Sequence, residues 1–146
     1  MRRKCPPKNT MRCALSAISV NESVCRQIIG AFLAAENPTV EELADVKCAV
    51  SEAVTNAIVH GYKNEGNGEI LLSAEIYPDR SVRITVRDKG CGIADVARAR
   101  EPLYTTDTSG ERSGMGFAVM ESFTDRLTVS SRLGLGTRIS MLKRLK

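Results

Sequence analysis

A glutamate and an asparagine stand four residues apart in a segment whose apolar residues recur at helical spacing. Side chains at this spacing lie on the same flank of a helix, so Glu52 and Asn56 would be neighbours there. The amide oxygen of Asn56 is a suitable ligand for a Mg²⁺ ion that arrives bound to nucleotide phosphates, because Mg²⁺ keeps several of its waters. Glu52 could then accept a proton from a hydroxyl that attacks the γ-phosphate. Taken alone, the pair is more typical of an exposed helix face without a ligand.

A second group, Asp88-x-Gly90-x-Gly92, follows an alternating apolar segment. Its carboxylate would stand at the end of a strand, where the glycines allow a flat ring to approach the backbone. A carboxylate accepts a hydrogen bond from the exocyclic amine of adenine, whereas guanine presents an oxygen at the equivalent place. The group therefore predicts a preference for adenine, although turns after strands are often built from such residues without any ligand.

The third group is Gly114-x-Gly116, at the expected start of a helix. Backbone N–H groups and the positive end of the helix dipole form an anion site there, and Arg112 could add a charged hydrogen bond to a phosphate. The spacing is not that of a P-loop, and no strand precedes it as a dinucleotide fold requires. Such glycine pairs also occur at helix starts that bind nothing. The three groups nevertheless follow the order that one nucleotide site needs, and we expect residues 94–113 to form a loop that closes over the phosphates.

The apolar pattern predicts helices laid on a sheet as the scaffold for these groups. Thr39 and Glu42 form a capping box at the start of the helix that carries the first group, and Gly61 would end that helix. Asn21 is the expected cap of the preceding helix. The expected order is strand 13–18, helix 21–35, helix 39–60, strands 70–76 and 82–86, loop 94–113, helix 114–123, and strands 127–131 and 137–142.

The chain has 146 residues, of which 42% are apolar and 26% charged, as expected of one soluble domain. We expect residues 12–146 to form that domain and residues 1–11 to be a flexible basic tail. The formal net charge of +4 comes from basic clusters at the two ends of the chain, while the body between them is net negative. A domain that reads nucleic acid would concentrate basic residues on a folded face. Direct nucleic-acid binding is therefore not expected.

Neither membrane insertion nor secretion is expected. No apolar run approaches the ~18 residues that a membrane span needs, and two prolines stand where a signal peptide carries its apolar stretch. The five cysteines include no CxxC pair and the chain has one histidine, so neither a disulfide framework nor a zinc site is indicated. The sequence favours a cytoplasmic protein with reduced thiols.

Three motifs carry a resemblance to a known superfamily. They are Glu52-Ala-Val-Thr-Asn56-Ala-Ile-Val-His60-Gly-Tyr62, Asp88-Lys-Gly-Cys-Gly-Ile93 and Arg112-Ser-Gly-Met-Gly-Phe117. They resemble the N box and two glycine boxes of the ATPases that include gyrase, Hsp90, histidine kinases and MutL. Over about residues 12–142 the chain is similar to a family of anti-sigma factors of endospore-forming bacteria that are serine kinases, with further matching stretches at Pro102-Leu-Tyr-Thr-Thr106 and Met120-Glu-Ser-Phe-Thr-Asp125.

The resemblance implies an α/β fold, a two-layer sandwich of the Bergerat type with a mixed sheet and helices on one face. It implies a site for ATP or ADP with Mg²⁺, in which Asn56 holds the Mg²⁺, Glu52 is the catalytic base and Asp88 reads the adenine. Residues 94–113 would form the ATP lid. The residues implied to bind the nucleotide are Asn56, Asp88, Gly90, Gly92, Ile93, Thr105, Thr106, Arg112, Ser113, Gly114, Met115, Gly116, Phe117 and Thr137.

The resemblance also implies partners. A member of this family is a homodimer that holds the sporulation sigma factor F away from RNA polymerase and phosphorylates a serine of an anti-anti-sigma factor. Arg26 matches the arginine that contacts both partners in competition. Three alternatives stay open: a nucleotide-gated anti-sigma module without a useful kinase rate, a stress-response paralogue, and a histidine-kinase-like domain that acts on a separate carrier.

Overall fold

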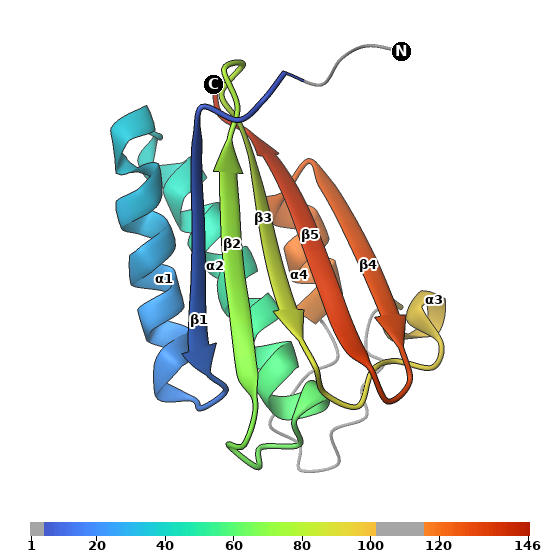
Figure 1. The fold of residues 1–146 in the computed structure, drawn as a ribbon. Coiled ribbons are helices and arrows are strands. Elements are labelled where there is room, and N and C mark those ends of the chain that lie inside the picture. Colours follow the sequence, from blue (N-terminus) through green and yellow to red (C-terminus); the bar gives the residue numbers. More distant parts are fainter. Residues whose placement is uncertain (1–4, 102–115) are drawn as a thin grey trace.

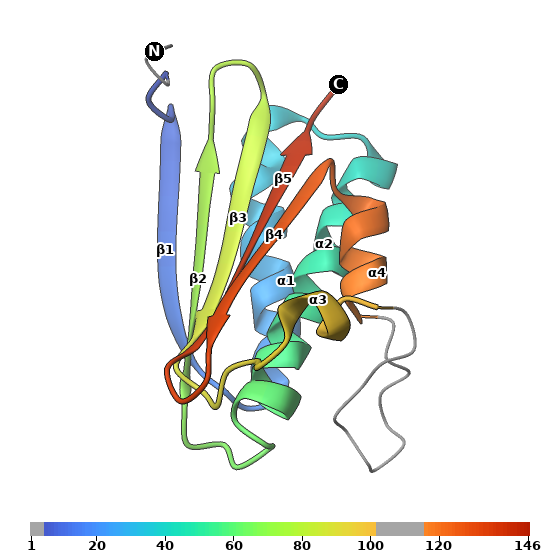
Figure 2. The same ribbon diagram turned by 90° about the vertical axis from the view of Figure 1, so that its right-hand side faces the viewer.

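The computed structural model describes residues 5–101 and 116–146, which form a layer of strands and a layer of helices (Figure 1, Figure 2). In chain order the elements are β1 (Asn9–Ser16), α1 (Val20–Leu33), α2 (Val40–Asn56), β2 (Glu69–Ile76), β3 (Ser81–Asp88), α3 (Val96–Ala99), α4 (Gly116–Phe123), β4 (Arg126–Arg132) and β5 (Gly136–Arg144). A 3₁₀ turn, Ala34–Glu36, follows α1, and a π-helical turn, Ala57–Gly61, follows α2. Apart from the short helix α3 inside the expected loop, this order matches the one predicted from the sequence. None of the described helices is long and apolar enough to cross a lipid bilayer.

The strands lie in the order β1-β2-β3-β5-β4, and every pairing in this sheet is antiparallel. The expectation of a mixed sheet is therefore wrong. Two helices between β1 and β2 bring the chain back to the end of the sheet that it left, and β2–β3 and β4–β5 are hairpins. Each of these connections reverses the chain direction between neighbouring strands, which produces antiparallel pairs.

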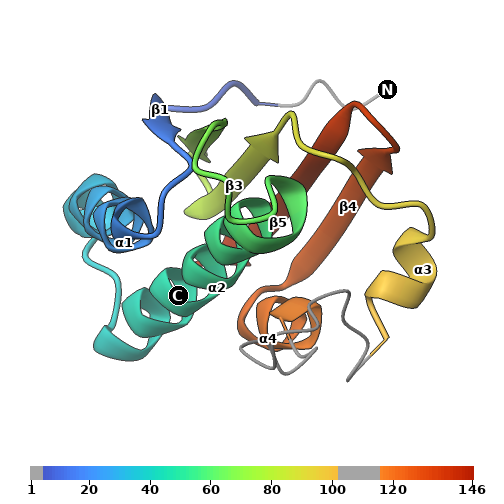
Figure 3. The same ribbon diagram turned by 90° about the horizontal axis from the view of Figure 1, so that it is seen from below.

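Helices α1, α2 and α4 lie on one face of the sheet, and no described element covers the other face (Figure 3). The residues of β2 that point toward the helices, Ile70, Leu72, Ala74 and Ile76, are buried, and so is Ile29 of α1. Burial of this apolar layer between sheet and helices is the main term that stabilises the fold. The expected two-layer α/β sandwich with helices on one face is confirmed.

The starts of the two long helices differ in how well the sequence predicted them. Thr39 Oγ1 accepts a hydrogen bond from the N–H of Glu42 at 3.0 Å, and the Glu42 carboxylate accepts one from the N–H of Thr39 at 2.9 Å. The predicted capping box is therefore present. The prediction that Asn21 caps α1 is wrong, because Ser19 holds the cap position. The Asn21 amide instead donates to the carbonyl of Ser16 at 2.8 Å, which fastens the helix to the end of β1.

Strand β1 begins at Asn9 rather than at Cys13. Residues 9–11 therefore belong to the sheet and not to the expected tail of residues 1–11. Met11 and Leu15 of this strand pack against the core and Cys13 between them is half-buried, while Arg12 and Ala14 are exposed. Because its first two residues, Asn9 and Thr10, are both polar, the alternation of apolar and polar residues was not recognised before Cys13.

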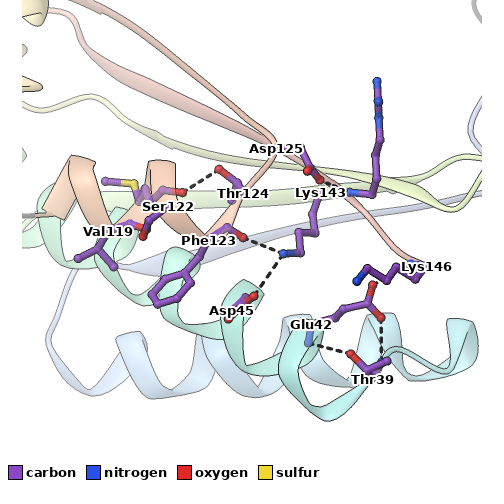
Figure 4. A network of polar contacts seen from close by, with 12 residues as sticks. Thr39, Glu42, Asp45, Val119, Ser122, Phe123, Thr124, Asp125, Lys143 and Lys146 are labelled. Atoms are coloured by element: carbon purple, nitrogen blue, oxygen red, sulfur yellow. Dashed lines mark hydrogen bonds and ion pairs between the residues drawn. The ribbon is translucent and has the colours of Figure 1, made fainter.

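Lys143 of β5 links two helices at the end of the molecule where β5 finishes (Figure 4). Its Nζ donates to Asp45 Oδ2 of α2 at 3.3 Å and to the carbonyl of Phe123 of α4 at 3.1 Å. The backbone N–H of Lys146 donates to the carboxylate of Glu42 at 2.8 Å. These contacts fix the first turns of α2, whose other end reaches the candidate site.

Candidate functional site

A cavity of about 450 Å³ lies where the end of α2, the end of β3, the start of α4 and the start of β5 meet. Its size is within the range of ~300–1,000 Å³ that is typical of small-molecule sites. In Figure 1 these elements meet at the end of the sheet where β3 finishes. The lining residues are Asn56, His60, Gly61, Lys63, Asp88, Cys91, Gly92, Ile93, Ala94, Asp95, Arg98, Ala99, Gly116, Phe117, Leu133, Thr137 and Ile139.

The end of α2 forms one wall of the cavity. The α-helix ends at Asn56, and the chain continues as the π turn Ala57–Gly61. Turns of this kind are frequent at functional sites. The carbonyl of Gly61 accepts a hydrogen bond from the N–H of Cys91 at 2.9 Å, which joins the helix end to the loop after β3. The predicted helix end at Gly61 agrees with the structure, although the last turn is π rather than α.

Gly90 and Gly61 allow this close approach of helix and loop. A Cβ atom on Gly90 would lie 2.2 Å from the carbonyl oxygen of Gly61, and one on Gly61 would lie 3.0 Å from Asp88 Oδ1. A side chain at position 90 would therefore push the loop away from the helix end. Gly90 does not line the cavity itself, but it positions the residues that do.

Asp88 is the last residue of β3, and its half-buried side chain lines the cavity. Its Oδ1 accepts a hydrogen bond from the N–H of Gly90 at 2.9 Å. Burial raises the pKa of this carboxyl above its usual value, and the backbone N–H groups of Gly90 and Thr137 oppose that shift. A carboxylate has several acceptor lone pairs, so Asp88 can still accept a hydrogen bond from a ligand inside the cavity.

The loop after β3 lies directly against the β4–β5 hairpin. Gly92 has a φ angle of +76°, which glycine adopts without strain. A Cβ atom there would lie 2.1 Å from the carbonyl oxygen of Arg132. Glycine is therefore required at this position both for the backbone angle and for the contact with β4.

Ser131 of β4 joins the same loop to β5. Its hydroxyl oxygen accepts a hydrogen bond from the N–H of Ile93 at 2.7 Å, and its proton goes to the carbonyl of Gly136 at 2.9 Å. Because that bond uses the only hydroxyl proton of Ser131, the Thr137 hydroxyl at 2.8 Å must be the donor of their contact. Thr137, which lines the cavity, therefore keeps acceptor capacity for a ligand.

The start of α4 forms the remaining wall. Gly116 and Phe117 line the cavity, and Met120 one turn later is buried in the core. The N–H groups of the first turn have no partner within the helix, so they can bind an anion. Most of the expected lid lies outside the described residues, and so do these predicted nucleotide-binding residues: Thr105, Thr106, Arg112, Ser113, Gly114 and Met115.

The cavity brings together most of the predicted site residues that the structure describes. Asn56, Asp88, Gly92, Ile93, Gly116, Phe117 and Thr137 line it. Glu52 is half-buried one turn before Asn56 on α2 and is not part of the lining. Arg26 is exposed on α1, where it pairs with Glu22 at 3.4 Å. The roles assigned to these residues stay predictions.

Several lining residues were missed by the sequence analysis. Lys63 and Arg98 bring positive charge to the cavity, and Lys63 follows the helix end with a φ angle of +55°. Leu133, in the β4–β5 turn, lines the cavity although it is 66% exposed. A large apolar side chain in an exposed glycine-rich turn was a usable signal for Leu133. Nothing local to the sequence marks Lys63 or Arg98, because only the fold brings them to the cavity that Asp88 also lines.

Comparisons with known proteins agree with this fold. Residues 16–143 match the family described as the histidine kinase-like ATPase domain. The chain is 49% identical over 137 residues to the anti-sigma F factor of Shouchella clausii, with 94% of this chain and 93% of that protein covered. It is 47% identical over 138 residues to the anti-sigma F factor of Bacillus licheniformis, with 94% of each chain covered.

Two solved structures share the fold at low identity. The RsbU and RsbW domains of Rv1364c from Mycobacterium tuberculosis give a TM-score of 0.70 at 24% identity, over 95% of this chain and 33% of that one. Full-length ShkA in complex with AMPPNP gives a TM-score of 0.58 at 19% identity, over 90% of this chain and 31% of that one. At these identities the likeness concerns the fold.

Proposed function

Because the chain belongs to the histidine kinase-like ATPase family and, within it, to the anti-sigma F factors, we propose that it is a sigma-factor inhibitor and an ATP-dependent serine kinase. It would bind the sporulation sigma factor F and use Mg-ATP to phosphorylate a serine of an anti-anti-sigma partner. It would work in the cytoplasm as a homodimer, without direct contact with nucleic acid or membrane.

The observation that carries the proposal is that Asn56, Asp88 and the start of α4 share one cavity. The residues present fit an adenine nucleotide with Mg²⁺. Asp88 offers a half-buried carboxylate to an exocyclic amine, and Asn56 offers an amide oxygen to a hard cation. Lys63 on the lining and the N–H groups at the start of α4 suit phosphate oxygens.

Bound ATP would supply the γ-phosphoryl group, and the residues of the chain would position it and accept the proton. Asn56 would hold the Mg²⁺ through its amide oxygen. Asp88 would favour adenine over guanine, because a guanine oxygen facing the carboxylate leaves two acceptors without a proton between them. Glu52 would take the proton from the serine hydroxyl. Its place outside the cavity lining suits a hydroxyl that a partner protein brings from outside.

Arg26 would be the residue for which the two partners compete. Its exposed guanidinium pairs with Glu22, and the Glu22 carboxylate also accepts a hydrogen bond from the hydroxyl of Ser51 on α2. Ser51 is the neighbour of Glu52 in the chain. A partner that engages Arg26 would therefore lie close to the proposed base, as phosphotransfer to that partner requires.

Phosphotransfer tests the proposal. The full chain is incubated with labelled Mg-ATP and an anti-anti-sigma protein, and we expect acid-stable label on a serine of that protein. Binding of ATP and partner without any label would identify a nucleotide-gated binding module. Acid-labile label on histidine would identify a histidine-kinase-like domain acting in trans. Either of these two results would contradict the proposed serine kinase.

The choice of sigma factor needs its own measurement. The full chain, loaded with nucleotide, is presented with equal amounts of sigma factor F and of a stress-response sigma factor. We expect it to retain sigma factor F preferentially. Preferential retention of the other one would identify the chain as a stress-response paralogue.

A further inference from the structure

The open face of the sheet carries a basic groove that the proposed function does not use. Figure 1 shows this face toward the viewer, with the helices behind it. The groove has a volume of about 270 Å³ and runs over β3, β5 and β4. Most of its lining consists of three arginines and three hydroxyl residues: Arg83, Arg126, Arg138, Thr128, Ser130 and Ser140.

Strand alternation places these residues on the face opposite the nucleotide cavity. Thr137 and Ile139 of β5 line the cavity, and the residues between and after them, Arg138 and Ser140, line the groove. A ligand in the groove is therefore separated from the proposed ATP site by the thickness of the sheet.

The outward positions of these three strands have an unusual composition. On β3 they are Ser81, Arg83, Thr85 and Arg87, on β4 Arg126, Thr128, Ser130 and Arg132, and on β5 Arg138, Ser140, Leu142 and Arg144. None of these residues is acidic, and every basic residue among them is arginine. A face that meets only water has no need for one sign of charge. Arginine is the cation that binds carboxylate and phosphate through two parallel hydrogen bonds.

Only one acidic residue lies beside the groove in the described sheet: Glu75 of β2 is directly opposite Arg83 in the register. Arg138 is directly paired across β5 and β3 with Arg87, which lies beside the groove, and such an arrangement of like charges costs stability. Within the described part of the chain, no carboxylate forms an ion pair with Arg83, Arg126 or Arg138. Arg83 instead lies over the ring of Tyr77, 5.9 Å from its centre. The groove therefore keeps a positive potential that an anionic partner could neutralise.

The register of β3, β5 and β4 places the outward side chains in rows that run across the three strands. A row of hydroxyl residues, Thr85, Ser140 and Thr128, crosses the three strands; Ser140 and Thr128 line the groove, whereas Thr85 is buried. The row on one side contains Arg87, Arg138 and Ser130, and the row on the other contains Arg83, Leu142 and Arg126. The two arginine rows are four residues apart along the strands, which corresponds to about 13 Å. The three strands together are about 10 Å wide.

We propose that this groove docks an extended acidic segment of a partner protein. Its carboxylates would bind Arg83 and Arg126 in one row and Arg138 in the other. The hydroxyls of Ser140 and Thr128 between the rows would donate to the remaining oxygens. In an extended segment, side chains four residues apart repeat at about 13 Å, which is the separation of the two rows.

Charge on the neighbouring strand favours an acidic segment over nucleic acid. The outward positions of β2 include Glu69 and Glu75, so the basic strip is confined to β3, β5 and β4. Nucleic-acid interfaces of specific proteins bury about 1,000 Å² or more, and they would extend over those glutamates. A single extended segment, by contrast, lies within a strip about 10 Å wide.

The test uses the full chain and a fluorescein-labelled peptide of alternating glutamate and serine, with a lysine–serine peptide as its counterpart. Two double variants are compared: R126Q/R138Q in the groove, and K8Q/K47Q, which removes the same charge from elsewhere on the surface. Lys8 lies before the edge strand β1, and Lys47 lies on α2, so neither is in the groove. Melting curves and ATP titrations of both variants check that the fold and the nucleotide cavity are intact.

We expect fluorescence anisotropy to show binding of the acidic peptide and none of the basic one. R126Q/R138Q should weaken acidic-peptide binding by about tenfold or more, and K8Q/K47Q by less than about twofold. Three results would overturn the proposal: no binding of the acidic peptide, equal loss in the two variants, or tighter binding of a DNA or RNA duplex through the same arginines. Because ATP binding is measured separately, failure of this proposal is distinct from failure of the proposed kinase function.

Discussion

The hydroxyl of Tyr62 accepts a hydrogen bond from the backbone N–H of Lys89 at 2.7 Å and donates one to the carbonyl of Glu69 at 2.7 Å. Its ring also fills the space beside Gly68, where a Cβ atom would lie 2.2 Å from it. One side chain thus ties the end of α2 to the start of β2 and to the loop after Asp88. The shape of the candidate nucleotide cavity depends on a residue that does not line it.

The substitution Tyr62→Phe tests this dependence. It removes both hydrogen bonds, so the free energy of unfolding should fall by about 1–2 kcal/mol. We expect Mg-ATP affinity to fall by about three- to tenfold, because the loop that carries Asp88 is held less firmly. Urea unfolding and calorimetry measure the two effects. The control is Tyr77→Phe, because the Tyr77 hydroxyl bonds to Glu75 away from the cavity. An equal loss of affinity in the control would contradict the role of Tyr62.

Alanine substitutions at two glycines with nearly the same φ angle distinguish the cost of backbone strain from the cost of a steric clash. Gly92 and Gly134 have φ angles of +76° and +77°. A Cβ atom on Gly92 would meet the carbonyl oxygen of Arg132 at 2.1 Å, whereas one on Gly134 meets nothing within 4 Å. Gly134→Ala should lower the free energy of unfolding by about 1–2 kcal/mol, because alanine is strained at this φ angle. Gly92→Ala should lower it by about 1–3 kcal/mol more, because of the clash, and should weaken nucleotide binding. Equal losses in urea unfolding would show that the clash is relieved without cost.

The carboxylate of Asp88 should lower the stability of the nucleotide-free chain at neutral pH while it strengthens nucleotide binding. Because burial raises its pKa in the folded chain, its contribution to stability is fully present below the unfolded pKa of about 3.9 and is lost as the pH rises through the folded pKa. The neutral variant Asp88→Asn should therefore melt at a higher temperature than the nucleotide-free wild type at neutral pH, and the difference should shrink below about pH 4.

The same variant should bind Mg-ATP at least about tenfold more weakly, because its amide no longer offers two acceptor oxygens to the adenine amine. Thermal melting across this pH range and ATP titration measure the two effects. A variant that is less stable than wild type at neutral pH would show that the carboxylate is a net stabilising group in the empty cavity.

Substitutions of Glu52 and Asn56 should have different effects, although the two residues lie one turn apart on α2. Glu52→Gln should retain Mg-ATP affinity and lose phosphotransfer by about 10²–10⁴-fold, because the proton acceptor is removed. Asn56→Ala should remove the dependence of nucleotide binding on Mg²⁺. Single-turnover phosphotransfer and calorimetry with and without a chelator measure these effects. A full transfer rate in Glu52→Gln would exclude it as the base.

The sequence predicted best those features that depend on neighbouring residues. The capping box of Thr39 and Glu42 requires only residues three apart, and the β2–β3 and β4–β5 hairpins require only alternation and a turn. The order of the three polar and glycine groups and the family resemblance led us to expect Asn56 and Asp88 in a nucleotide site, and the structure places both on one cavity.

Features that depend on distant segments were missed. The role of Ser131 exists only because the fold brings Ile93 and Gly136 to its hydroxyl. The cap of α1 was missed for a local reason: the helix begins at Val20, so Ser19 holds the cap position and Asn21 lies inside the first turn. The prediction of a mixed sheet was wrong because the direction of β2 relative to β1 depends on the end of the sheet to which the two intervening helices bring the chain back.

A crystal structure with Mg²⁺ and a non-hydrolysable ATP analogue tests the central claim most directly. We expect the adenine amine within hydrogen-bond distance of Asp88, the Mg²⁺ bound to the Asn56 amide oxygen, and the phosphates at the first turn of α4. An analogue bound outside the cavity, or with its base remote from Asp88, would contradict that claim.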